Sequence, residues 1–76
     1  MSGGLPVASG RKVIKALKQA GFVEHHTTGS HCVLRHVTDQ SRRITVPTHS
    51  RDLKPGTFRH IIKQSRLTVE EFSALL

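Results

Sequence analysis

The sequence predicts an α+β fold, in which a three-stranded antiparallel sheet carries two helices on one face and a short C-terminal helix follows. Apolar residues recur at helical spacing near both ends of the chain. Between them lie three short segments rich in strand-forming residues, joined by brief polar connections. Strands joined so closely run antiparallel, because a parallel pair needs a long crossover. The 76 residues predict a single domain over residues 1–76, with residues 1–8 as a loose leader.

The first helix is expected at about residues 9–20. Val13, Ile14 and Leu17 are spaced for one helical face, and lysines occupy the opposite face. Ser9 suits the N-cap, where its hydroxyl accepts from a free backbone N–H of the first turn. Gly21 suits the position after the helix, which often requires a left-handed backbone conformation.

Three strands are expected at residues 22–27, 31–37 and 42–46, with turns at 28–30 and 38–41. Alternation places the apolar side chains of the last two strands on one face: Cys32, Leu34, Ile44 and Val46. The same alternation places His31, Val33 and Arg35 on the other face. Pro47 is expected to end the third strand, because proline has no N–H to donate.

Two further helices are expected at about residues 55–65 and 69–75. Pro55 suits a first helical position, and Phe58, Ile61 and Ile62 form the apolar stripe that follows it. The run Thr68 to Glu71 matches a capping box, in which the two side chains each satisfy a backbone N–H.

The charge of the chain favours an anionic partner. Lysine and arginine number 12 against 5 acidic residues, a net charge of +7. Basic residues crowd the second half of the chain: Arg35, Arg42, Arg43, Arg51, Lys54, Arg59 and Lys63. The start of the second predicted helix, residues 54–57, offers free N–H groups, a hydroxyl and a cation, which suit a phosphate. Nucleic acid is therefore the favoured partner, the alternative being a merely solubilising surface; no apolar run approaches the roughly 20 residues of a membrane span.

Neither a metal nor another cofactor is expected. The chain has six histidines but one cysteine, and the spacing fits no closed tetrahedral zinc set. His31 and His36 lie an odd number of residues apart on one strand, so they should face opposite sides. The single Cys32 excludes an internal disulfide, and no signal peptide precedes the domain, which together favour a reducing cytoplasm.

His31 follows the turn Thr28-Gly29-Ser30, at the first position of a strand. Imidazole can give or take a proton at cellular pH, although the stretch alone favours a histidine that only caps the turn. On an RNA-binding surface, such a group could deprotonate the 2′-OH while cations stabilise the phosphorane. Ser30 and Cys32 flank His31, but neighbours on a strand point apart and do not form a nucleophile–base pair.

Four pieces, in this order and spacing, carry a family resemblance: residues 13–22, Gly29-Ser30-His31, residues 44–47, and residues 53–58 with Ile61-Ile62. From about Val13 to Leu76 the chain resembles the HicA toxins of bacterial toxin–antitoxin pairs. The resemblance implies an α-β-β-β-α fold like that of a double-stranded-RNA-binding domain. It also implies a ribosome-independent mRNA interferase that a HicB antitoxin neutralises. The family's functional histidine follows the Gly-Ser turn, and only His31 matches it.

Two positions qualify the resemblance. Many members carry a second histidine or another polar residue after the functional one, where this chain has Cys32. His49 falls where many relatives carry a histidine, which makes it a secondary candidate.

The prediction is therefore a cytoplasmic endoribonuclease, the toxin of a type II toxin–antitoxin system, that cleaves mRNA without metal and is inhibited by a HicB-like antitoxin. His31 is the predicted general acid or base, and the predicted RNA contacts are Ser30, Arg35, Arg43, Lys54, Thr57 and Arg59. One alternative is a non-catalytic RNA-binding module of the same fold. Such modules usually carry a lysine cluster at the start of the second helix, where this chain has only Lys54. Another alternative is a pure interaction partner for an acidic protein.

Overall fold

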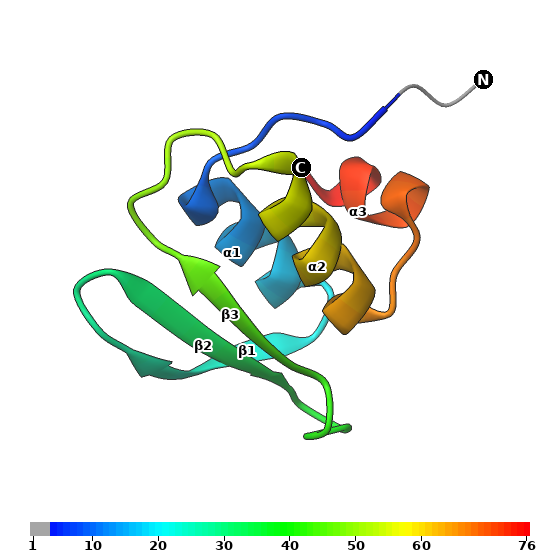
Figure 1. Ribbon diagram of the computed structural model, residues 1–76. Coiled ribbons are helices and arrows are strands. Elements are labelled where there is room, and N and C mark those ends of the chain that lie inside the picture. The colour runs from blue at the N-terminus through cyan, green and yellow to red at the C-terminus, as the bar shows by residue number, and fades with distance from the viewer. Residues whose placement is uncertain (1–3) are drawn as a thin grey trace.

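The computed structural model describes residues 4–76 and has the predicted α+β architecture (Figure 1). The elements are α1 (Gly10–Gln19), β1 (Phe22–Thr27), β2 (His31–His36), β3 (Arg43–Pro47), α2 (Pro55–Ser65) and α3 (Val69–Leu75). The strands form one antiparallel sheet in the order β1-β2-β3. Helix α1 packs against β1, β3 and α3, and α2 packs against β3. All three helices lie on the same side of the sheet, and within residues 4–76 no helix covers its other side (Figure 1).

The third strand is shifted by one residue from its predicted range. The sequence predicts 42–46, but the strand spans Arg43–Pro47, because the Arg42 N–H turns back to the carbonyl oxygen of Asp39 at 3.0 Å. Pro47 can still pair as the last residue of the strand, since the next N–H, that of Thr48, donates to the Ser30 carbonyl oxygen at 2.9 Å. The second strand ends at His36, one residue before its expected end.

The local capping signals act as predicted. The Ser9 hydroxyl accepts from the Lys12 N–H at 3.2 Å, and Gly21 has a φ of 97° after α1. Thr68 and Glu71 form the reciprocal capping box of α3. Each cap satisfies N–H groups that the first turn of a helix otherwise leaves unpaired.

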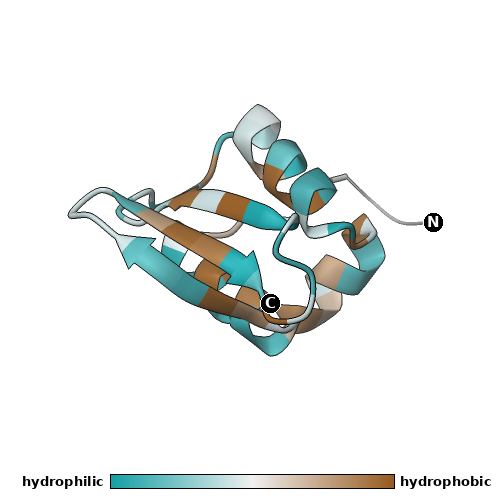
Figure 2. Ribbon diagram, turned by 90° about the horizontal axis from the view of Figure 1, so that it is seen from below, coloured by the Kyte–Doolittle hydropathy of each residue, from teal (hydrophilic) through white to brown (hydrophobic). Residues whose placement is uncertain are grey.

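The core lies between the sheet and the helices. The four strand residues predicted to face the helices are buried: Cys32, Leu34, Ile44 and Val46. They meet apolar side chains from all three helices, and Phe58 and Phe72 pack edge to face with ring centroids 5.6 Å apart. Figure 2 shows hydrophobic segments alternating with hydrophilic ones along the strands and the helices.

The leader is partly packed. Residues 1–3 lie outside the described residues. Ala8 is buried and its carbonyl oxygen accepts from the Leu53 N–H at 3.0 Å, while Leu5 packs against the core. Leu5 and Ala8 thus contact the domain, whereas Val7 between them is 75% exposed. Within residues 4–76, no helix has the length and apolar character needed to cross a membrane.

Candidate functional site

The His31 side chain is exposed at the start of β2, on a backbone that the preceding turn holds tightly. The Thr28 N–H donates to the His31 carbonyl oxygen at 2.8 Å, and the His31 N–H donates to the Thr28 hydroxyl at 3.1 Å. On the ring, Nδ1 lies 2.9 Å from the hydroxyl oxygen of Ser30, and the described residues place no hydrogen-bond partner on Nε2. A partner on one ring nitrogen fixes the orientation of an imidazole. The arrangement leaves the other nitrogen open to solvent.

The loop between β3 and α2 is bonded to the turn that carries His31. Thr48 makes both bonds: its N–H donates to the Ser30 carbonyl oxygen at 2.9 Å and its hydroxyl donates to the Gly29 carbonyl oxygen at 3.2 Å. The exposed His49 comes next along the chain. His31 itself faces Pro47 across the sheet. One end of the sheet therefore brings together the proposed proton-transfer residue and the loop that holds the secondary candidate.

The start of α1 holds the same loop from the other side. The Gly10 N–H donates to the Ser50 carbonyl oxygen at 2.9 Å. A Cβ at Gly10 would lie 1.9 Å from the carbonyl oxygen of Pro47, so only glycine permits this approach of the backbones. The loop is thus bonded to the His31 turn on one side and to the start of α1 on the other.

The predicted RNA contacts separate into two groups. Ser30, Arg35 and Arg43 belong to the sheet and to its first turn. Lys54, the N-cap residue of α2, lies with Thr57 and Arg59 of its first half on the side of the sheet that the helices cover. All but the half-buried Arg35 are exposed. A single site does not unite the six residues, which lie in two separate parts of the surface.

Arg35 and Arg43 face each other across β2 and β3. Side chains directly opposite in an antiparallel pair share a face of the sheet, here the face that His31 also shares. Among residues 4–76, the ion pairs are Lys18–Glu24, with 2.6 Å between Nζ and Oε1, and Arg66–Asp39, with 3.5 Å between Nη1 and Oδ2. Neither arginine of the facing pair has an acidic partner among these residues, and the Nε atom of Arg35 is buried without a hydrogen-bond partner there.

Arg42 has a structural role instead. The sequence places it among the basic residues that favour nucleic acid, but its guanidinium lies over the Phe22 ring, 5.3 Å from the centroid. Its Nη2 also donates to the carbonyl oxygen of Ser65, at the end of α2. The cation thus satisfies a carbonyl that the helix leaves unpaired and meets the negative end of the helix dipole. It also ties the end of α2 to the start of β3, so the start of α2 lies toward the His31 end of the sheet.

A family comparison adds to this geometry. The family model for the HicA toxin of bacterial toxin–antitoxin systems matches residues 10–67, more than half of the chain. The chain belongs to the HicA toxin family. As a member, it is the toxin component of a toxin–antitoxin system. A comparison with curated proteins gave no match. The matched range includes the His31 turn, both arginines of the facing pair and α2, and it ends before α3.

Two further side chains of this HicA toxin that could do chemistry, His36 and Cys32, are engaged in packing. His36 packs edge to face on Phe22, with centroids 5.1 Å apart, so it lies on the opposite face from His31 as predicted. Cys32 is buried, and the Thr27 hydroxyl lies 3.6 Å from its sulfur. Within the described residues, no three side chains of the His, Cys, Asp or Glu type gather where a metal ion could bind.

Proposed function

We propose that this HicA toxin is an endoribonuclease that cleaves mRNA in the cytoplasm, with His31 as the residue that transfers protons. The observation that carries the proposal is the His31 ring, which is exposed, has Ser30 beside Nδ1, and stands on the face that also bears two unpaired arginines. The exposed imidazole can accept the proton of a 2′-OH, and the arginines, farther along the same face, suit neighbouring phosphates of the same RNA strand.

The reaction needs no nucleophile from the protein. His31 accepts the proton of a 2′-OH, and the 2′-oxygen attacks the adjacent phosphorus. The new bond from phosphorus to the 2′-oxygen forms as the bond to the 5′-oxygen breaks, and the leaving oxygen takes up a proton. The products are a 2′,3′-cyclic phosphate and a 5′-OH, so the atoms balance without metal or water. His49, beyond the loop residue that bonds the His31 turn, is a candidate donor of the second proton.

The test is cleavage of single-stranded RNA by purified wild type, His31→Ala and His31→Gln. A proton-transfer residue contributes about 10²–10⁴-fold in rate, so both variants should lose activity by that factor. Glutamine can hydrogen-bond but cannot carry the proton at neutral pH. His60→Ala, at an exposed histidine of α2, is the matched control and should cleave normally. A chelator should not change the cleavage rate of the wild type, and the wild type should not cleave DNA. If a folded His31→Ala protein cleaves at the wild-type rate, the proposal is wrong and His31 only caps the turn.

We also propose that a HicB-like antitoxin inhibits the toxin by covering His31. The positive charge of the chain would speed association with an acidic partner. In the same assay, cleavage should stop at one equivalent of antitoxin. Continued cleavage by the saturated complex would contradict occlusion of the site.

A further inference from the structure

We infer that single-stranded RNA crosses the uncovered face of the sheet, from His31 to a phosphate subsite at Arg35, rather than following the start of α2. This inference rests on the proposed function, because it describes the path of the strand that His31 would cleave. The outer face is defined by the side chains that point away from the helices: Val23, His25 and His26 of β1, His31, Val33 and Arg35 of β2, and Arg43 and Thr45 of β3.

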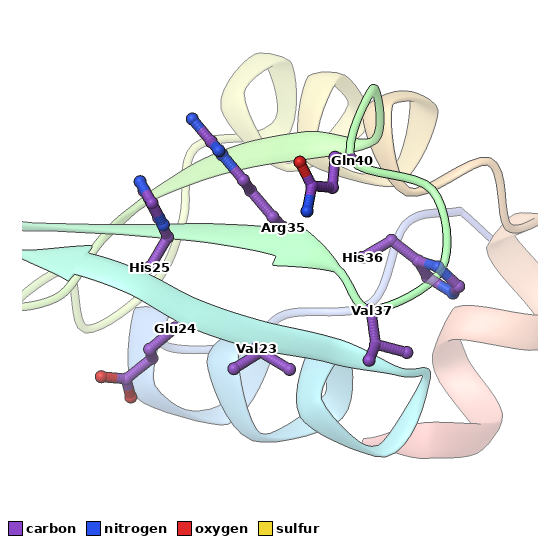
Figure 3. A pocket seen from close by; sticks show the side chains of 7 residues that line it. All are labelled: Val23, Glu24, His25, Arg35, His36, Val37 and Gln40. Atoms are coloured by element: carbon purple, nitrogen blue, oxygen red, sulfur yellow. The ribbon is translucent and has the colours of Figure 1, made fainter.

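The outer face has no acidic side chain to neutralise its arginines. Glu24, the one acid on β1, points away from His25 and Arg35 (Figure 3). It pairs with Lys18 of α1 and accepts a hydrogen bond from Thr27, and these contacts lower the pKa of its carboxyl. Asp39, in the turn after β2, accepts from the Ser41 hydroxyl at 2.6 Å and pairs with Arg66. The nearby carboxylates are therefore engaged elsewhere.

The facing arginines form a site for an anion. Like charges directly opposite in a sheet destabilise it, so Arg35 and Arg43 cost stability unless an anion lies between or beside them. A guanidinium presents a rigid fork of donors that matches the oxygens of a phosphate. Within residues 4–76 the buried Nε–H of Arg35 has no hydrogen-bond partner, as is also true of Arg42, so an anion would meet the terminal nitrogens of the Arg35 guanidinium rather than Nε.

Beside Arg35 the surface is hollowed into an open depression of about 290 Å³ (Figure 3). His25 and Gln40 line it, and so do His36 and Glu24, the latter with its carboxylate pointing away from Arg35. His25 reaches this place because the strand register shifts between Glu24 and His26, which leaves it without a partner on β2. Figure 3 shows the His25 and Arg35 side chains pointing the same way, with Gln40 next to Arg35. The depression thus offers a cation for a phosphate, and an imidazole and an amide for a base.

The chemistry of the face suits single-stranded RNA better than an acidic protein. Histidine rings and guanidinium planes stack on unpaired bases, and the face has both. Strand β2 carries both His31 and Arg35, and the four steps along the strand from one to the other span roughly 13 Å. A chain of nucleotides lying along β2 would meet both. The group on α2 lies on the side of the sheet that the helices cover, and the aromatic rings of α2 are those of the buried Phe58 and the exposed His60.

The experiment measures binding in the cleavage-deficient His31→Ala protein, by fluorescence anisotropy with a labelled single-stranded RNA. Arg35→Gln with Arg43→Gln removes the sheet pair, and Lys54→Gln with Arg59→Gln is the matched change on α2. Loss of charged hydrogen bonds predicts that the sheet variant weakens binding about tenfold or more. Its log K against log salt should become shallower by about 0.7 for each phosphate that the variant no longer neutralises. The α2 variant should bind within about twofold of its parent, and His25→Ala should lose about fivefold through stacking.

Thermal unfolding checks that each variant is folded. If loss of the half-buried Arg35 unfolds the chain, the single variant Arg43→Gln replaces the double variant in the binding assay. Normal RNA binding by the folded sheet variants, or a larger loss in the α2 variant, would overturn the inference. The inference would also be overturned if the sheet variants still bound RNA but no longer bound an acidic antitoxin, because the outer face would then be a binding site for a protein. Because binding is measured without His31, the result is independent of cleavage: a wild type that binds RNA on this face but never cuts it would contradict only the proposed function.

Discussion

The two faces of the sheet differ in what their side chains do, although the same strands supply both. On the covered face of β2, Cys32 and Leu34 are 1% and 0% exposed and belong to the core. On the outer face of the same strand, His31 is exposed and Val33 and Arg35 are half-buried. Alternate residues of a strand point to opposite sides, so a residue that stabilises the core is followed by one whose side chain is available for chemistry. Substitutions one position apart on β2 should therefore affect different properties: stability on the covered face, and binding or cleavage on the outer face.

The largest expected effect on stability is the difference between substituting Leu34 and substituting its neighbour Val33. Leu34→Ala removes a fully buried side chain from the core and should cost about 2–5 kcal/mol of the free energy of unfolding. Val33→Ala, on the outer face, should cost clearly less, because solvent can fill the space that the smaller side chain leaves. Urea unfolding followed by circular dichroism measures both. Equal losses would show that the outer face is packed against something, and the distinction between the faces would fail.

A smaller effect is expected in the helical layer. Thr68→Ala deletes the side-chain oxygen that accepts from the Glu71 N–H at 3.0 Å and should cost about 1 kcal/mol. Ser73→Ala, in the middle of the same helix and exposed, should cost nothing measurable. Because α3 lies on the covered side, the folded Thr68→Ala protein should cleave RNA at the wild-type rate. A loss of cleavage without a loss of stability would tie α3 to the site.

The smallest effect concerns Glu24 and depends on pH. Lys18 lowers the pKa of the Glu24 carboxyl below its ordinary 4.5 by hydrogen bonding and charge. The folded state thus binds this proton less readily than the unfolded state, and the stabilisation is present above the ordinary pKa and lost as the pH falls through the folded one. Glu24→Gln should therefore be slightly less stable than wild type at neutral pH and equal to it in acid. The pair is exposed, so salt should shrink the difference. Asp52→Asn serves as the control, and a difference that persisted in acid would contradict the ion pair as its cause.

Much of the fold could be predicted because its signals are local. Helix caps such as Ser9 and Thr68 act through residues three positions away, and the alternation along β2 and β3 follows from strand geometry alone. The sheet order followed from connections too short for a crossover. His31 at the start of a strand, after a tight turn, was likewise a local prediction, and its proposed role came from the family resemblance.

The sequence by itself determined which residues face the core and where each element begins to within a residue or two. Only the tertiary structure decided which basic residues are free. Arg42 and Arg43 are neighbours in the sequence, yet Arg42 is bonded to the end of α2 while Arg43 faces Arg35. The bulge that brings His25 to Arg35, and the left-handed Arg66 that ends α2, have no signal in the sequence. The physical reason is that strand register and helix docking are set by contacts between distant segments, and these contacts choose which charges are paired and which remain open to an anion.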